Sequence, residues 1–178
     1  MNTPIRRPGF SLVEIMIVVA VIGMLAAIAI PQVVNQMHKA RIHQAEADLT
    51  LIASGVNCLT SDTGMYPSVE GEPIHYISEP GSTINAEVED LSTPNAGLLS
   101  CPITTNRFGP KWQGPYLQEM PPDPWGRPYF FDPDYNIYSN RSQKTGLISV
   151  SSVVGSYGSN RRGKNEYDSD DIFVILKR

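Results

Sequence analysis

A run of apolar residues near the N-terminus constrains this chain more than any other feature of its sequence. The run extends from Phe10 to Ile30 and contains a single charged residue, Glu14. Twenty-one residues of α-helix span roughly 31 Å, which matches the hydrocarbon thickness of a bilayer. A charged side chain in such a helix costs on the order of 2–3 kcal/mol near the centre and less near an end, so the presence of Glu14 indicates a partner or a function.

The run differs from an ordinary secretory signal, whose apolar core has about 7–15 residues and ends at a small-residue cleavage site. Ala27-Ile28-Ala29 fits the Ala-x-Ala pattern formally, but it lies inside the run and is followed by Ile30-Pro31. Cleavage between Gly9 and Phe10 would instead leave the helix on the mature protein, with a new α-amino group four residues from Glu14. We therefore expect the helix to be retained.

The start of the run carries a short motif, Gly9-Phe10-Ser11-Leu12-Val13-Glu14, ahead of an apolar helix with Gly23 inside it and Pro31 at its end. This motif resembles the class III signal of type IV pilins and type II secretion pseudopilins. The resemblance implies that a prepilin peptidase cuts after Gly9 and methylates the new N-terminal residue, Phe10. It also implies that Glu14 aligns each incoming subunit with its neighbour in a filament. A plain signal anchor that tolerates one acidic residue is the alternative.

The chain has 178 residues, which leaves room for one small domain behind the helix. Its formal charge of −4 gives no electrostatic support to nucleic-acid binding. Arg6 and Arg7 before the helix predict, by the positive-inside rule, that the globular part faces away from the cytoplasm. We divide the chain into a leader (1–9), a transmembrane and assembly helix (10–31), an amphipathic helix (32–62), a variable loop-rich segment (63–113) and a β-sheet region with an acidic C-terminal loop (114–178).

Beyond Pro31, an apolar stripe predicts that the helix continues with one face packed on a sheet. Its members recur at spacings of three and four residues, at Ile42, Ala45, Leu49, Ile52, Val56 and Leu59. Gly64 is suited to the left-handed conformation that ends a helix. Pro31 removes a backbone donor, so we expect a kink or local melting there. The resemblance implies that the segment between Gly23 and Pro31 can lose helicity in assembled filaments.

The rest of the chain predicts a small sheet after a loop-rich segment. Six prolines between residues 67 and 111 leave room for only a short helix near 84–91. At 121–126, Pro-Pro-Asp-Pro-Trp-Gly predicts a rigid turn, with Trp125 as a packed anchor and Gly126 at the reversal. Strand-forming residues at 129–131, 147–154 and 172–176 predict a three- or four-stranded antiparallel sheet over the helix. The expected fold is α+β, a long N-terminal helix packed on a small C-terminal sheet, as in pilins and pseudopilins.

The turn and the last loop sharpen the resemblance. Together with Gly114-Pro115-Tyr116-Leu117, the turn resembles the segment that distinguishes the major, G-type pseudopilin from type IV pilins. The oxygen-rich loop at 158–171 resembles a calcium-binding loop of that family, which implies the ligands Asn160, Asp170 and Asp171, with Asp168 as a further donor. Asn160 replaces the usual aspartate, and three basic residues join the loop, which should weaken affinity. A solvated turn whose acids pair with those bases is the alternative.

The remaining residues that could take part in catalysis or metal binding do not form a recognisable active site. Cys58 and Cys101 are the only cysteines, and in an oxidising compartment we expect a disulfide between them, with two buried free thiols as the alternative. No G-x-S-x-G, H-E-x-x-H or phosphate-binding glycine loop occurs. His38 and His43 are five residues apart, so they do not share a metal-binding helix face. We therefore predict a structural protein and not an enzyme.

The resemblance as a whole implies a subunit of a periplasmic pseudopilus that supports type II protein secretion across the outer membrane. Subunits would wait in lipid as single-pass proteins of the bacterial inner membrane, with the C-terminal domain in the periplasm. They would then polymerise through their N-terminal helices into a helical homopolymer. Further implied partners are the prepilin peptidase and methyltransferase, an inner-membrane assembly platform and minor pseudopilins.

A type IV pilin subunit for adhesion, motility or DNA uptake is the alternative function. The turn at 121–126 and the acidic C-terminal loop favour secretion. The long insert at 67–111 and an expected long connection from 135 to 146 weaken that match.

Overall fold

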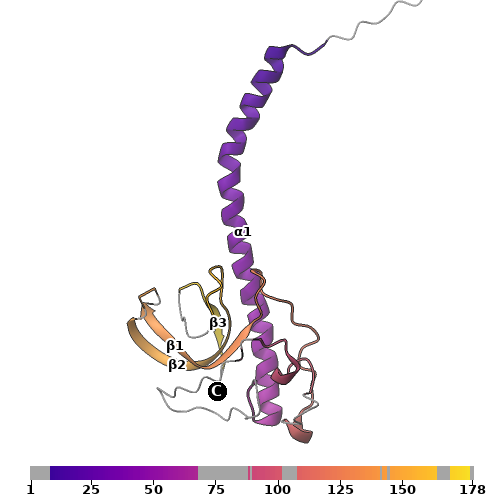
Figure 1. Ribbon diagram of the computed structural model, residues 1–178, viewed down its shortest axis with the longest axis vertical. Coiled ribbons are helices and arrows are strands. Elements are labelled where there is room, and N and C mark those ends of the chain that lie inside the picture. Colours follow the sequence, from indigo (N-terminus) through magenta and orange to yellow (C-terminus); the bar gives the residue numbers. More distant parts are fainter. Residues whose placement is uncertain are drawn as a thin grey trace, which may run out of the picture. The chain divides into compact units, whose positions relative to one another are not determined.

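The computed structural model describes residues 9–67, 88, 90–101, 108–140, 142–143, 145–163 and 169–176. Within these residues the chain forms α1 (Leu12–Thr63), the short 3-10 helices η1 (Pro94–Ala96) and η2 (Gly109–Lys111), and the strands β1 (Phe130–Asn140), β2 (Thr145–Ser156) and β3 (Ile172–Ile175) (Figure 1). The chain divides into two compact units, Met1–Ala40 and Arg41–Arg178. Helix α1 contributes residues to both units.

The first unit contains the apolar part of α1. Large apolar side chains such as Leu12, Ile22 and Met37 are more than half exposed. An 18-residue window of α1 has a mean hydropathy of 2.8 and none of it is buried, so α1 can cross a membrane by length and composition. The α-helix continues through Pro31, so local melting, one of the two distortions expected there, is absent from the isolated chain. A kink at Pro31 stays a prediction.

The second unit begins with the amphipathic part of α1, which packs on the sheet. In the predicted stripe, Ile42 is half-buried and the other five residues are buried. The last four, from Leu49 to Leu59, join a core cluster with residues from the loops and strands, among them Leu91, Tyr129, Phe131 and Val154. Burying one such aliphatic side chain contributes roughly 1.5–3 kcal/mol. The predicted stripe is confirmed.

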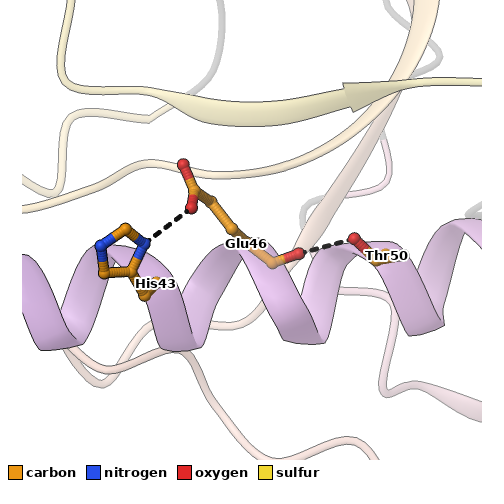
Figure 2. A network of polar contacts seen from close by, with 3 residues as sticks. All are labelled: His43, Glu46 and Thr50. Atoms are coloured by element: carbon orange, nitrogen blue, oxygen red, sulfur yellow. Dashed lines mark hydrogen bonds and ion pairs between the residues drawn. The ribbon is translucent and has the colours of Figure 1, made fainter.

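The solvent face of this part of α1 carries local polar contacts at His43, Glu46 and Thr50. His43 Nδ1 lies 3.1 Å from Glu46 Oε2, and the Thr50 hydroxyl donates to the carbonyl oxygen of Glu46 at 2.8 Å. Figure 2 shows both contacts. The His43 and Glu46 side chains are 76% and 56% exposed, so this contact contributes little to stability. The helix ends at Thr63, where Gly64 adopts a φ of +74° and its N–H donates to the Thr60 carbonyl at 2.8 Å. The predicted left-handed cap is confirmed.

The strands form one antiparallel sheet in the order β1-β2-β3. In Figure 1 this curved sheet lies beside the C-terminal part of α1, as the shared core cluster requires. The register between β1 and β2 shifts between Asp132 and Tyr135, where Pro133 cannot donate a ladder hydrogen bond. The described residues thus form three strands, within the expected range of three or four.

Two expectations about connecting segments differ from the structure: the expected short helix does not include Val88 or Leu91, and the expected long connection after 135 is wrong. At the end of the expected helix near 84–91, Val88 instead forms an antiparallel bridge with Phe131, and the Leu91 N–H donates to the Tyr129 carbonyl at 3.0 Å. Residues 84–87 and 89 lie outside the described residues. The expected long connection from 135 to 146 is mostly a hairpin, because β1 continues to Asn140 and β2 begins at Thr145. The bulge around Pro133 breaks the alternation that would have revealed the longer strand.

Candidate functional site

The predicted processing site lies just ahead of α1. Gly9 and Phe10 are exposed and outside the helix, which begins at Leu12. Exposed backbone that is free of secondary structure is the kind of segment that a peptidase can engage. Residues 1–8 of the predicted leader lie outside the described residues.

Ser11 and Glu14 cap the first turn of α1 reciprocally. The Ser11 N–H donates to Glu14 Oε2 at 3.1 Å, and the Val13 N–H donates to Ser11 Oγ at 3.3 Å. This is a capping-box arrangement, and a carboxylate also interacts favourably with the partial positive charge at a helix N-terminus. The cap was missed in the sequence, although the Ser-x-x-Glu pattern signals it. Glu14 therefore has a hydrogen-bond partner within its own chain.

The proline-rich turn at 121–128 is organised by the buried side chain of Asp123. Its Oδ1 accepts from the N–H groups of Trp125 at 3.0 Å and Arg127 at 2.7 Å, and its Oδ2 accepts from the Ser156 hydroxyl at 2.5 Å. Asp123 is 3% exposed and Trp125 is 7% exposed. Gly126 makes the reversal with a φ of +84°. The turn, its reversal at Gly126 and the burial of Trp125 are confirmed, and the hydrogen-bonding role of Asp123 is new.

The last loop brings two residues of the predicted calcium set into contact. The Asn160 N–H donates to Asp170 Oδ2 at 3.1 Å, and the Ser159 hydroxyl donates to the same oxygen at 2.5 Å. Asp171 is 5% exposed and accepts from the Tyr135 hydroxyl at 2.7 Å. Asp168 lies outside the described residues.

The donor types of this loop fit a calcium ion, which prefers carboxylate, amide and backbone oxygens. Gly158 lets the Asp170 carbonyl approach closely, because a Cβ on Gly158 would lie 2.1 Å from that oxygen. Among the described residues, no three His, Cys, Asp or Glu side chains converge to hold a metal. A full set of six to eight ligands would therefore draw on backbone carbonyls, water or Asp168.

Three tyrosine hydroxyls fasten separate segments of the second unit together. Each donates to an aspartate: Tyr116 to Asp62 at 2.9 Å, Tyr129 to Asp48 at 2.7 Å, and Tyr135 to Asp171 at 2.7 Å. The first two tie the middle of the chain to α1, and the third ties β1 to the last loop. Burial, with the neighbouring carboxylate, raises the pKa of the Tyr116 and Tyr129 phenols above the usual value of 10.

The bond from Tyr129 predicts a pH dependence of stability. The folded state keeps this phenol neutral because its pKa is raised, while the unfolded chain ionises near pH 10. Its contribution is fully present below pH 10 and is lost as the pH rises beyond that value. Melting temperatures of the wild type and Tyr129→Phe at about pH 8 and about pH 11 should therefore converge with rising pH. A constant difference between the two proteins would contradict this cause.

The two cysteines are free thiols in the structure. Cys58 is exposed on α1, and Cys101 is half-buried in the loop-rich segment. A bridge between them stays a prediction.

A surface cleft of about 220 Å³ lies beside the proline-rich turn. Its residues include Met120, Pro122 and Pro128, and its one carboxylate, Asp90, accepts from the N–H and hydroxyl of Ser92. No histidine, the usual base for a nucleophilic hydroxyl, is among the lining residues.

Comparisons with known proteins find matches both to the N-terminal segment and to the region that contains the turn and the sheet. The family model "Prokaryotic N-terminal methylation motif" matches residues 6–30, and the model "Type II secretion system (T2SS), protein G" matches residues 91–172. The type II secretion system core protein G of Pseudomonas aeruginosa is 32% identical over 124 residues, which cover 70% of this chain and 72% of that protein. The proteins of the same name from Aeromonas hydrophila and Vibrio cholerae are 26% and 23% identical, with 70% of this chain and 71% and 69% of their own lengths covered. No solved structure matches the chain. The chain therefore belongs to the family of the type II secretion system core protein G.

Proposed function

We propose that this chain is a structural subunit of the pseudopilus of type II secretion and that it polymerises through its N-terminal helix. The observation that carries the proposal is the apolar part of α1, which begins with the capping residue Glu14 in its first turn. An 18-residue window of this helix is apolar and has no buried surface. Such a helix needs an apolar environment, and none of that window is buried by the residues that the structure describes. Helices of neighbouring subunits provide that environment in a filament, and a repeated head-to-tail contact of this kind gives a filament when the rotation does not close a ring.

Before assembly, the same helix anchors the subunit in the bacterial inner membrane. Arg6 and Arg7 lie on its N-terminal side, so the positive-inside rule favours a cytoplasmic N-terminus and a C-terminal domain in the periplasm. The assembled filament would then stand in the periplasm and support protein secretion across the outer membrane.

Processing precedes assembly in this proposal. The match to the N-terminal methylation motif includes Gly9 and Phe10, both exposed ahead of α1. A prepilin peptidase cuts between them and methylates the amine of Phe10. An inner-membrane assembly platform and minor pseudopilins are the further partners that this role calls for.

Glu14 would guide each subunit into the filament. In the isolated chain its carboxylate accepts from the Ser11 N–H in an exposed position, so this bond can be exchanged for another. We expect the new donor to be the Phe10 amine of a neighbouring subunit. Pairing the two charges offsets the cost of placing both in an apolar surrounding.

Deletion of the gene tests the function directly. We expect loss of exoprotein export, unchanged twitching motility, and recovery of export with a plasmid copy of the gene. Loss of twitching with export intact would instead identify a type IV pilin. The purified protein should also polymerise into filaments when the assembly system is supplied.

We further propose that the last loop binds Ca²⁺ through Asn160, Asp170 and Asp171, with Asp168 as a further donor. Two observations support this proposal. Asn160 and Ser159 donate to the Asp170 carboxylate. The Asp170 carbonyl oxygen lies where a Cβ on Gly158 would be, so only glycine allows this close approach. A bound cation would neutralise the acidic end of the loop and order it.

Calcium should raise the thermal stability of the full-length chain in detergent. A ligand that binds only the folded state at about 100 times its Kd contributes about 2.7 kcal/mol, or roughly 5–10 °C in the melting temperature for a chain of this size. We expect this shift between excess chelator and about 1 mM calcium. Asp170→Asn should lose most of it, and equal melting temperatures for the wild type in both conditions would refute calcium binding.

A further inference from the structure

A buried chain of hydrogen bonds joins the proline-rich turn to the loop that we propose as the calcium site. The Ser156 hydroxyl, at the end of β2, donates to Asp123 Oδ2 at 2.5 Å and accepts from the Gly158 N–H at 3.1 Å. Ser156 has no exposed surface and Asp123 is 3% exposed. Because one hydroxyl group serves both bonds, the carboxylate in the turn and the first residue of the loop are held in a fixed relation.

Gly158 in turn lies directly against Asp170. Gly158 adopts a φ of +65°, and the Asp170 carbonyl occupies the space that a Cβ would fill on this glycine. The next two residues, Ser159 and Asn160, then donate to the Asp170 carboxylate. A displacement of Gly158 would therefore move both sides of the proposed calcium site.

The turn also contacts the loop through a second residue. The guanidinium carbon of Arg127 lies 5.5 Å from the ring centroid of Tyr157, a cation–π distance. Tyr157 connects Ser156 to Gly158 and is 4% exposed. Since the Arg127 N–H donates to Asp123, the same turn holds this segment through a hydrogen bond on one side and a charged side chain on the other.

We infer that Asp123 and Ser156 are positioning residues for calcium binding, which act on the site through Gly158 without contacting the ion. This inference rests on the proposed calcium site. Residues that orient metal ligands in this indirect way typically change metal affinity about 10- to 100-fold when they are replaced. The proline-rich turn, which carries no ligand of its own in this arrangement, would thereby set the calcium affinity of the subunit.

The test compares two serine-to-alanine variants of the same strand in the full-length chain in detergent. Ser156→Ala removes the hydroxyl that joins Asp123 to Gly158. Ser152→Ala is the matched control, because its hydroxyl donates to the Pro133 carbonyl at 3.0 Å, away from the loop. Neither change alters the charge of the protein. Two quantities are measured: the Kd for Ca²⁺ by titration of the metal alone, and amide hydrogen exchange at Asn160 in excess chelator.

We expect Ser156→Ala to weaken calcium binding at least about tenfold and to accelerate exchange at Asn160, whose N–H bonds to Asp170. Ser152→Ala should leave both quantities at their wild-type values. Equal Kd values for the two variants would overturn the inference. If Ser156→Ala fails to fold, Asp123→Asn keeps the size of the side chain while changing the bond to Ser156, and the same comparison applies.

The exchange measurement separates this inference from the calcium proposal. A wild type that binds no calcium refutes the calcium site and, with it, the role of the turn in affinity. If the wild type binds calcium but Ser156→Ala exchanges the Asn160 amide at the wild-type rate, the positioning role alone is refuted.

Discussion

Glu14→Gln and Glu14→Ala are both expected to abolish filament assembly and to leave membrane insertion intact. Insertion depends on the apolar length of α1, which neither change shortens. Assembly loses the carboxylate that would pair with the Phe10 amine of a neighbouring subunit, so that amine would stay uncompensated in an apolar surrounding. Filament yield after shearing, with membrane-fraction immunoblots for insertion, measures the two effects separately.

The capping box offers a control that separates charge from helix capping. Glutamine at position 14 keeps an acceptor for the Ser11 N–H, so Glu14→Gln preserves the cap and removes only the charge. Ser11→Ala does the reverse, since it removes the acceptor of the Val13 N–H and keeps the carboxylate. We expect Ser11→Ala subunits to assemble, at a cost of about 1 kcal/mol in the first helical turn. Normal filaments from Glu14→Gln would show that the charge is not required, and a loss of filaments in Ser11→Ala would show that the cap is.

The elements that follow from local pattern could be predicted from the sequence. The stripe from Ala45 to Leu59 has the period of a helix and a single buried face, and Gly64 supplies the conformation that few other residues adopt. The β-branched residues at 147–154 and 172–176 predict the two strands that contain them. These signals depend on neighbours within a few residues, so they survive without knowledge of the fold.

The contacts that hold the sites could not be predicted, because they join residues far apart in the chain. Tyr129 and Asp48 are 81 positions apart, and Ser156 and Asp123 are 33 positions apart. A tyrosine or an aspartate in a sequence does not indicate its partner when only the fold brings the two together. The length of β1 could not be predicted for a related reason. The bulge at Pro133 interrupts the local alternation of the strand, and the pairing with β2 continues on both sides of it.

Asp123→Ala should destabilise the second unit by about 3–5 kcal/mol. The change leaves the N–H groups of Trp125 and Arg127 and the Ser156 hydroxyl without their acceptor in a site where Asp123 is only 3% exposed. An unsatisfied buried donor costs about 1–3 kcal/mol, and part of that cost is recovered if the turn opens to water. Asp123→Asn keeps one carbonyl oxygen and should lose less.

Urea unfolding of the full-length chain in detergent, followed by the fluorescence of Trp125 and Trp112, measures this loss. Glu119→Ala is the matched control, because it removes an exposed carboxylate from the segment just before the turn and should change stability by less than about 0.5 kcal/mol. Equal losses from Asp123→Ala and Glu119→Ala would mean that the turn is held by its prolines and by the packing of Trp125 alone. A large loss from Asp123→Ala with a smaller one from Asp123→Asn would instead assign the rigidity of the turn to the acceptor oxygens of this one carboxylate.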